Sequence, residues 1–108
     1  LFHIITSIYG SGPAWYLELS SKIVEAAEKS GLEKTEANKI VKELVKSLPS
    51  FLSENEFSST IDKIKSPNGT TEAGLNSLVD DSFDKIILNA IITATNRSQE
   101  ISREISND

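Results

Sequence analysis

The apolar residues of this chain recur every three or four positions, which is the spacing of one face of an α-helix. The pattern is clearest in a segment whose apolar positions are Ala37, Ile40, Val41, Leu44, Val45 and Leu48. No segment alternates apolar and polar residues strictly, as a half-buried strand requires. For a length of 108 residues, the sequence predicts a single all-α domain of about five helices.

Proline and glycine mark the expected ends of the first two helices. Ser11 is expected to cap a first helix that starts with Gly12 and Pro13, because proline fits the first turn of a helix. Gly31 is expected to end that helix, since glycine readily takes the left-handed conformation that closes many helices. Pro49 is expected to kink or end the second helix, because its ring clashes with the preceding turn.

Two shorter helices are expected in the middle of the chain. The third covers residues 60–65, where Ser59 and Asp62 resemble a capping box. The fourth should start within the pair Thr70–Thr71 and run to about Val79. The turn-forming residues between these two helices predict a tight connection.

The last helix is predicted to be the longest and to be apolar on two sides. Its main stripe consists of Phe83, Ile86, Ile87, Ala90, Ile91, Ala94, Ile101 and Ile105. Leu88 and Ile92 form a second apolar face, and a helix that is apolar on two sides is usually buried on both. The pattern leaves two interpretations open: Leu88 and Ile92 pack within their own chain, or they contact a second chain.

The composition argues against several classes of partner. The formal charge is −5 and no basic cluster occurs, so nucleic acid is not an expected partner. The apolar residues 1–9 fall far short of the roughly 20 needed to span a bilayer, so no membrane partner is expected either. The chain begins with Leu and contains no Met. We therefore expect it to be a fragment or a processed product of a longer protein.

Metal binding is not expected. The absence of cysteine removes zinc–thiolate sites. The only histidine, His3, lies near the start of the chain and is interpreted as inert. Asp80, Asp81 and Asp84 gather where the last helix begins, and carboxylates at that position complement the helix dipole.

The segment from Ser66 to Thr71 is the strongest candidate for a binding site. It places Gly69, Thr70 and Thr71 at the start of a helix, where backbone N–H groups lack intrahelical partners and favour an anion such as a carboxylate. Ser66 and Thr71 add hydroxyl groups that can donate and accept hydrogen bonds. Helix-start chemistry alone leaves an alternative, which is an ordinary turn followed by a threonine cap.

Two motifs in this sequence resemble those of the pyrroline-5-carboxylate reductases. The first is Tyr9-Gly10-Ser11-Gly12-Pro13-Ala14-Trp15, and the more specific one is Ser66-Pro67-Asn68-Gly69-Thr70-Thr71-Glu72-Ala73-Gly74-Leu75. The segment Ala94-Thr95-Asn96-Arg97-Ser98 resembles the end of the family's last helix. Asn68 stands where the family usually has Gly, and Asn tolerates a left-handed backbone better than most residues.

The resemblance implies a fold and an activity. It implies that residues 1–108 are a C-terminal dimerisation and substrate-binding domain, similar to the C-terminal helical domain of 6-phosphogluconate dehydrogenase, in an intertwined homodimer. Rings of such dimers are a further expectation. The family reduces 1-pyrroline-5-carboxylate to L-proline with NADPH or NADH, which is bound mainly by an N-terminal Rossmann domain that this chain lacks. The cofactor-binding residues are therefore not among these 108. A cytoplasmic location is expected.

The resemblance also assigns roles to individual residues. Thr71 is expected to be the catalytic residue that orients the ring nitrogen of the imine acid. Ser66 is expected to hold the substrate carboxylate together with the N–H groups of Gly69 and Thr70. Leu88 and Ile92 are expected at the dimer interface. Two alternatives remain: a non-catalytic helical interaction module, or a reductase acting on a related cyclic imine acid.

Overall fold

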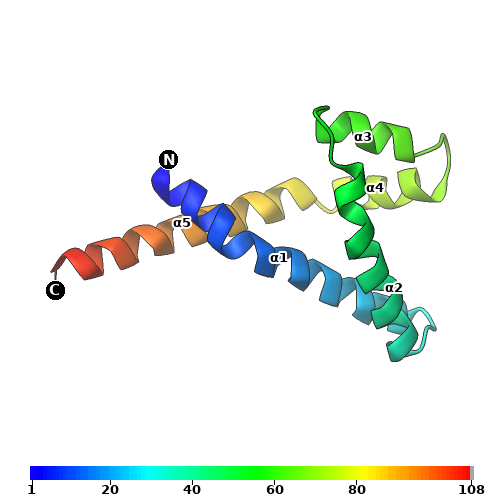
Figure 1. Cartoon of the computed structure of the whole chain (residues 1–108), viewed down its shortest axis with the longest axis horizontal. Helices are drawn as coiled ribbons and strands as arrows, with labels where there is room; N and C mark the ends of the chain where they lie inside the picture. The colour runs from blue at the N-terminus through cyan, green and yellow to red at the C-terminus, as the bar shows by residue number, and fades with distance from the viewer. Residues whose placement is uncertain (108) are drawn as a thin grey trace. The chain divides into compact units, whose positions relative to one another are not determined.

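The computed structural model describes residues 1–107, and every regular element among them is a helix (Figure 1). The five α-helices are α1 (Phe2–Lys29), α2 (Lys34–Ser47), α3 (Phe57–Ile64), α4 (Thr70–Asp80) and α5 (Phe83–Asn107), and a short 3-10 helix, η1 (Leu48–Phe51), follows α2. The prediction of an all-α chain with about five helices is confirmed. Asp108 lies outside the described residues.

The chain divides into two compact units, and the boundary falls inside α1. One unit contains Leu1–Gly12 together with the chain from Phe57 onward, and the other contains Pro13–Glu56. Pro13 therefore lies in the interior of a helix. Its missing N–H leaves the carbonyl of Tyr9 without its usual intrahelical partner, so the helical hydrogen bonding is locally weakest at this boundary.

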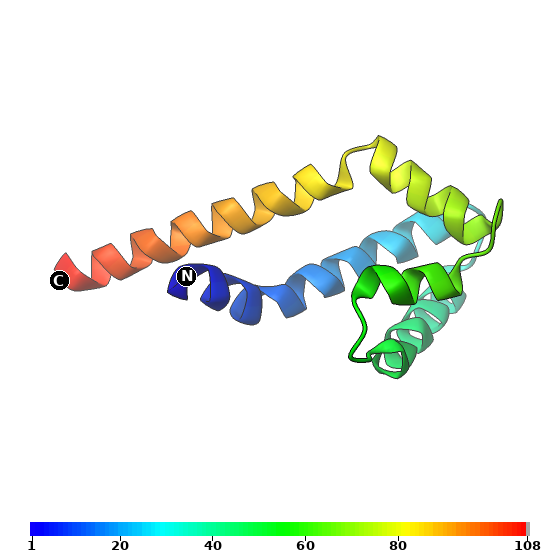
Figure 2. The ribbon, with the colours of Figure 1, turned by 90° about the horizontal axis from the view of Figure 1, so that it is seen from above.

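The predicted start of the first helix at Gly12, with Ser11 as its cap, is wrong, because α1 begins ten residues earlier, at Phe2. The reason lies in the packing of this early segment against α5 within its own unit. Ser7 is buried, and a hydrogen bond of 2.8 Å joins Nδ1 of His3 to the hydroxyl of Ser98. Figures 1 and 2 both draw the start of α1 beside the second half of α5. These contacts hold the part of α1 that precedes Pro13 against α5.

The second unit contains a small apolar core. Val24 of α1 packs with Ala37 and Val41 of α2, and the partly buried Ala27 lies against them. The left-handed Gly31 (φ +114°) ends α1: its N–H donates to the carbonyl of Glu28, and the N–H of Leu32 donates to that of Ala27. The prediction that Gly31 stops the first helix is confirmed.

The ends of the remaining helices test the other sequence predictions. α2 ends at Ser47, and η1 follows from Leu48 and contains Pro49, so the prediction that Pro49 ends the second helix is confirmed. α3 begins at Phe57, so the predicted capping box is wrong: Ser59 lies inside the helix. Asp62 instead forms an exposed ion pair with Lys65 at 3.2 Å. α4 begins at Thr70 and α5 begins after the left-handed Ser82, as predicted.

Most large apolar side chains of the described residues are exposed. Among residues 1–106 the buried apolar side chains are Val24, Ala37 and Val41, which all belong to the second unit. On α5, Leu88 is 55% exposed and Ile92 is 47% exposed. The interpretation that these two residues pack within their own chain is therefore not supported. Across residues 1–107, no helix is both long enough and apolar enough to cross a bilayer.

Candidate functional site

The candidate loop joins α3 to α4 and is held in a tight turn. The N–H of Gly69 donates to the carbonyl of Ser66 over 3.0 Å. Asn68 has a φ of 59°, in the left-handed region. The prediction that asparagine can keep this turn in place of glycine is confirmed. The turn leads directly into α4, which starts at Thr70.

Gly69 is required by a close approach to Ser66. A Cβ atom added at Gly69 would lie 2.5 Å from the Ser66 hydroxyl oxygen and 3.1 Å from the Ser66 carbonyl oxygen. Gly69 is also the N-cap of α4, and it makes no side-chain cap hydrogen bond. The alternative of a threonine cap is therefore wrong, because both threonines lie within the first turn of α4.

The first turn of α4 presents backbone donors. The N–H groups of Thr70, Thr71 and Glu72 have no intrahelical acceptor, because no helical carbonyl precedes them by four residues. The Gly69 N–H, which was predicted to bind a carboxylate, already donates within the turn. In this conformation an anion would therefore be held by the N–H groups of Thr70 and Thr71, with the hydroxyls of Ser66 and Thr71 nearby in sequence.

A residue that sequence reasoning missed also faces this turn. The carboxylate of Glu72 accepts a hydrogen bond of 3.3 Å from the N–H of Asn68. Glu72 thereby restrains the left-handed residue and places a negative charge at the start of α4, where the helix dipole favours it. The spacing of four residues between Asn68 and Glu72 was the only sequence signal for this contact. Ser66, Thr70 and Thr71 are exposed, so the loop is an open surface feature.

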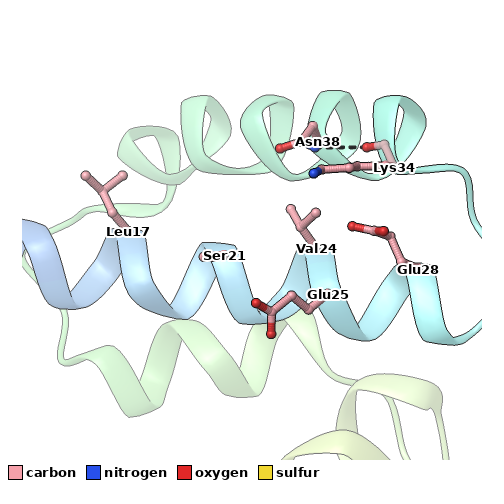
Figure 3. Close-up of a pocket in the computed structure, with 7 residues that line it drawn as sticks. All are labelled: Leu17, Ser21, Val24, Glu25, Glu28, Lys34 and Asn38. Atoms are coloured by element: carbon pink, nitrogen blue, oxygen red, sulfur yellow. Dashed lines mark hydrogen bonds between the residues drawn. The ribbon is translucent and has the colours of Figure 1, made fainter.

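A first hollow lies elsewhere, in the second unit between α1 and α2 (Figure 3). It has a volume of about 350 Å³ and is lined by Leu17, Ser21, Val24, Glu25, Glu28, Lys34 and Asn38. Asn38 donates to the carbonyl of Lys34 over 2.9 Å. Glu25 pairs with Lys22 at 3.3 Å, and this hydrogen bond raises the pKa of Lys22 above its ordinary value. Glu25 and Asn38 therefore already have partners within the chain.

A second hollow, of about 500 Å³, lies in the first unit between the start of α1 and α5. It is lined mainly by small residues, and Arg97 is its only charged lining residue. The guanidinium of Arg97 is exposed and pairs with Glu100 at 3.0 Å and with Glu104 at 3.3 Å. Hydrogen bonding to Glu100 contributes most to raising the pKa of Arg97. The positive charge of Arg97 is therefore balanced by the carboxylates of Glu100 and Glu104 on the same helix.

The acidic residues and the histidine do not form a metal site in the part of the chain that the structure describes. No group of three or more potential ligand side chains comes together within residues 1–107. Asp80 and Asp81 close α4, and Asp84 lies in the first turn of α5. His3 joins α1 to α5 through Ser98, a structural role that its position in the sequence did not indicate.

The two glycines around the start of α4 lead to opposite stability predictions. Gly69→Ala is expected to lower the free energy of unfolding by about 1 kcal/mol, because its methyl group displaces the Ser66 side chain and crowds the Ser66 carbonyl. Gly74→Ala is the matched control: it lies inside α4 with no atom near the added Cβ. It should stabilise the chain by roughly 0.5–1 kcal/mol. Urea denaturation measures both, and equal shifts would contradict the crowding at Gly69.

Comparison with known proteins gives one consistent family. The model described as pyrroline-5-carboxylate reductase dimerisation matches residues 1–101. Pyrroline-5-carboxylate reductase 1 of Bacillus subtilis is 38% identical over 104 residues, covering 94% of this chain and 35% of that protein. The Pseudomonas aeruginosa pyrroline-5-carboxylate reductase is 31% identical over 103 residues, covering 94% of this chain and 38% of that protein.

A solved structure has the same fold. The crystal structure of Plasmodium falciparum pyrroline carboxylate reductase with NADP bound superposes with a TM-score of 0.84 at 30% identity. The superposition covers 92% of this chain and 38% of that one. The chain therefore spans less than two fifths of the length of each of these relatives.

Proposed function

The chain belongs to the pyrroline-5-carboxylate reductase dimerisation family, and from this we propose that it is the C-terminal dimerisation and substrate-binding domain of a two-domain reductase. The longer protein would reduce 1-pyrroline-5-carboxylate to L-proline with NADPH or NADH, in the cytoplasm. The match over residues 1–101 supports the domain assignment, since the remaining three fifths of each relative have no counterpart in this chain.

The observation that carries the proposal is the turn from Ser66 to Gly69 leading into α4. The substrate is a small ring that bears a carboxylate and an imine nitrogen. Its carboxylate fits the free N–H groups of Thr70 and Thr71 and the Ser66 hydroxyl, because helix N-termini favour anions. The Thr71 hydroxyl would bond the ring nitrogen and fix which face of the ring is exposed. A threonine hydroxyl is a weak acid, so its role is orientation rather than net proton donation.

The nicotinamide cofactor does not fit the residues described here. A dinucleotide is held where a strand passes through a glycine-rich turn into a helix, and residues 1–107 contain no strand. When bound to the rest of the reductase, the cofactor supplies the hydride that reduces the imine carbon. The contribution of this chain is to bind and orient the imine acid.

We propose that the reductase is a homodimer through this domain. The family description supports the dimer, and the exposed apolar face of α5 at Leu88 and Ile92 supplies a surface that a second copy would cover. An intertwined arrangement and rings of dimers remain predictions from the family resemblance.

Two assays test whether NADPH binding and oxidation require the part of the reductase outside this chain. The 108-residue chain titrated with NADPH in a calorimeter should give no binding heat and should not oxidise NADPH, because the proposed dinucleotide site lies in the rest of the reductase. The full-length protein should oxidise NADPH when 1-pyrroline-5-carboxylate is added. Tight NADPH binding by the chain alone would contradict the domain assignment. A full-length protein that dimerises but does not reduce the imine acid would instead be a non-catalytic interaction module.

A further inference from the structure

The candidate loop contains a dipeptide with its own chemistry. Asn68-Gly69 is the only place in the sequence where glycine follows asparagine. An asparagine side-chain amide can be attacked by the backbone nitrogen of the next residue, and the attack is least hindered when that residue is glycine. Asparagine is for this reason among the thermolabile residues of proteins.

The structure restrains this pair only through contacts of a single turn. Asn68 is exposed and lies between α3 and α4, so turning its backbone breaks no helical hydrogen bond. Two contacts restrain it: the Gly69 N–H donates to the Ser66 carbonyl at 3.0 Å, and the Asn68 N–H donates to Glu72 at 3.3 Å. Both contacts are hydrogen bonds of a single turn, and the one to Glu72 is solvent-exposed, so local opening costs little.

Five of the other six asparagines are protected by their surroundings, and the sixth, Asn107, precedes Asp108, which lies outside the described residues. Four of them lie inside helices, where the backbone nitrogen of the next residue is held in the helical ladder: Asn38, Asn76, Asn89 and Asn96. Asn55 lies outside the helices, but it is followed by Glu56, whose side chain hinders attack. These residues are internal controls with the same side chain in the same molecule.

We propose that Asn68 is a deamidation site that alters the substrate loop as the protein ages. The Gly69 nitrogen loses its proton and bonds to Cγ of Asn68, the Cγ–Nδ2 bond breaks, and ammonia leaves. Water then opens the resulting five-membered imide. Opening at Cγ gives aspartate, and opening at the main-chain carbonyl gives isoaspartate. No electron is transferred, and solvent water is the only co-reactant.

The products change the loop in two ways. Either product adds a negative charge beside Glu72, two residues before the first N–H group expected to hold the substrate carboxylate. Isoaspartate also lengthens the backbone by one carbon and disrupts the turn between Ser66 and Gly69. This functional consequence rests on the proposed function of the loop, whereas the deamidation itself does not.

The chemistry is tested on the 108-residue chain incubated at 37 °C at neutral and mildly alkaline pH. Peptide mapping by mass spectrometry should find deamidation at Asn68 well before any at Asn55 or Asn76, and faster at the higher pH, because the attacking nitrogen must be deprotonated. Isoaspartyl methyltransferase should label the same peptide. A synthetic peptide over residues 64–72 should react faster than the folded chain. Equal rates at Asn68 and Asn55 would overturn the proposal.

The consequence is tested on the full-length protein, fresh and after the same incubation. The KM for 1-pyrroline-5-carboxylate should rise about tenfold in aged wild type and in Asn68→Asp, the effect of one like charge at roughly 6 Å in a partly hydrated site. Aged Asn68→Gly should keep its initial KM. An unchanged KM after complete deamidation would overturn the functional consequence. Inactivity of the fresh protein would contradict the proposed function and leave the deamidation result intact.

Discussion

The double variant Leu88→Asp/Ile92→Asp is expected to abolish the dimer. In the proposed homodimer each chain contributes both side chains, so four large apolar groups are exposed again when the dimer separates. At about 1.5–3 kcal/mol for each buried side chain, their loss weakens association by at least about 6 kcal/mol, or roughly four orders of magnitude. Light scattering at tens of micromolar should then record the monomer mass for the variant and the dimer mass for wild type.

The matched control is Asn89→Asp/Thr93→Asp. It introduces the same two charges, with the same spacing, on exposed positions one residue further along α5. These positions lie about 100° around the helix from Leu88 and Ile92, on its polar side. The control should remain dimeric. Dissociation of both variants would show that added charge alone separates the chains. If Leu88→Asp/Ile92→Asp remained dimeric, this face of α5 would not lie at the interface.

Thr71→Ala in the full-length reductase is expected to lower turnover about a hundredfold, the usual effect of removing one well-placed donor. The loss should appear mainly in kcat, because the carboxylate contacts of Ser66 and the backbone remain. The affinity for NADPH should stay nearly unchanged, since this loop holds no dinucleotide. Steady-state kinetics with 1-pyrroline-5-carboxylate and NADPH measures the first effect, and calorimetry measures the second.

Two further substitutions separate the hydroxyl from the shape of the side chain. Thr71→Ser keeps the hydroxyl and should retain most activity, whereas Thr71→Val keeps the branched shape and should be as slow as Thr71→Ala. Thr93→Ala removes a threonine hydroxyl from the exposed side of α5 and is the control for the deletion itself. Wild-type turnover in Thr71→Val would show that the Thr71 hydroxyl takes no part in the reaction.

Sequence periodicity located the helices well but failed at two starting points. α2 and α5 follow their apolar stripes, α2 ends just before Pro49, and α4 begins within the predicted pair Thr70–Thr71. α1 was predicted too short because Pro13 has the local signature of a first turn, and the contacts that extend the helix back to Phe2 come from α5, many residues away. α3 was misplaced because the Ser59–Asp62 spacing resembles a cap, although the helix begins earlier.

The candidate loop was identified from its residue types, but its internal contacts were not. Asn68 was predicted to take the left-handed conformation, and it does. The Gly69 N–H donates to the Ser66 carbonyl because of the way the turn closes. The residue types alone could not predict this hydrogen bond. Glu72 was not predicted to take part in the loop, and its role follows only from the fold of the turn beside it.

The small core formed by Val24, Ala37 and Val41 has a consequence for the lifetime of each pair of subunits. With so few buried side chains in the described part of the chain, this domain is expected to have little stability when separated from its partner, as in obligate dimers. Partners would then exchange only as fast as the pair unfolds. A subunit whose loop has been altered would then remain bound to its first partner. Both subunits would therefore be degraded together.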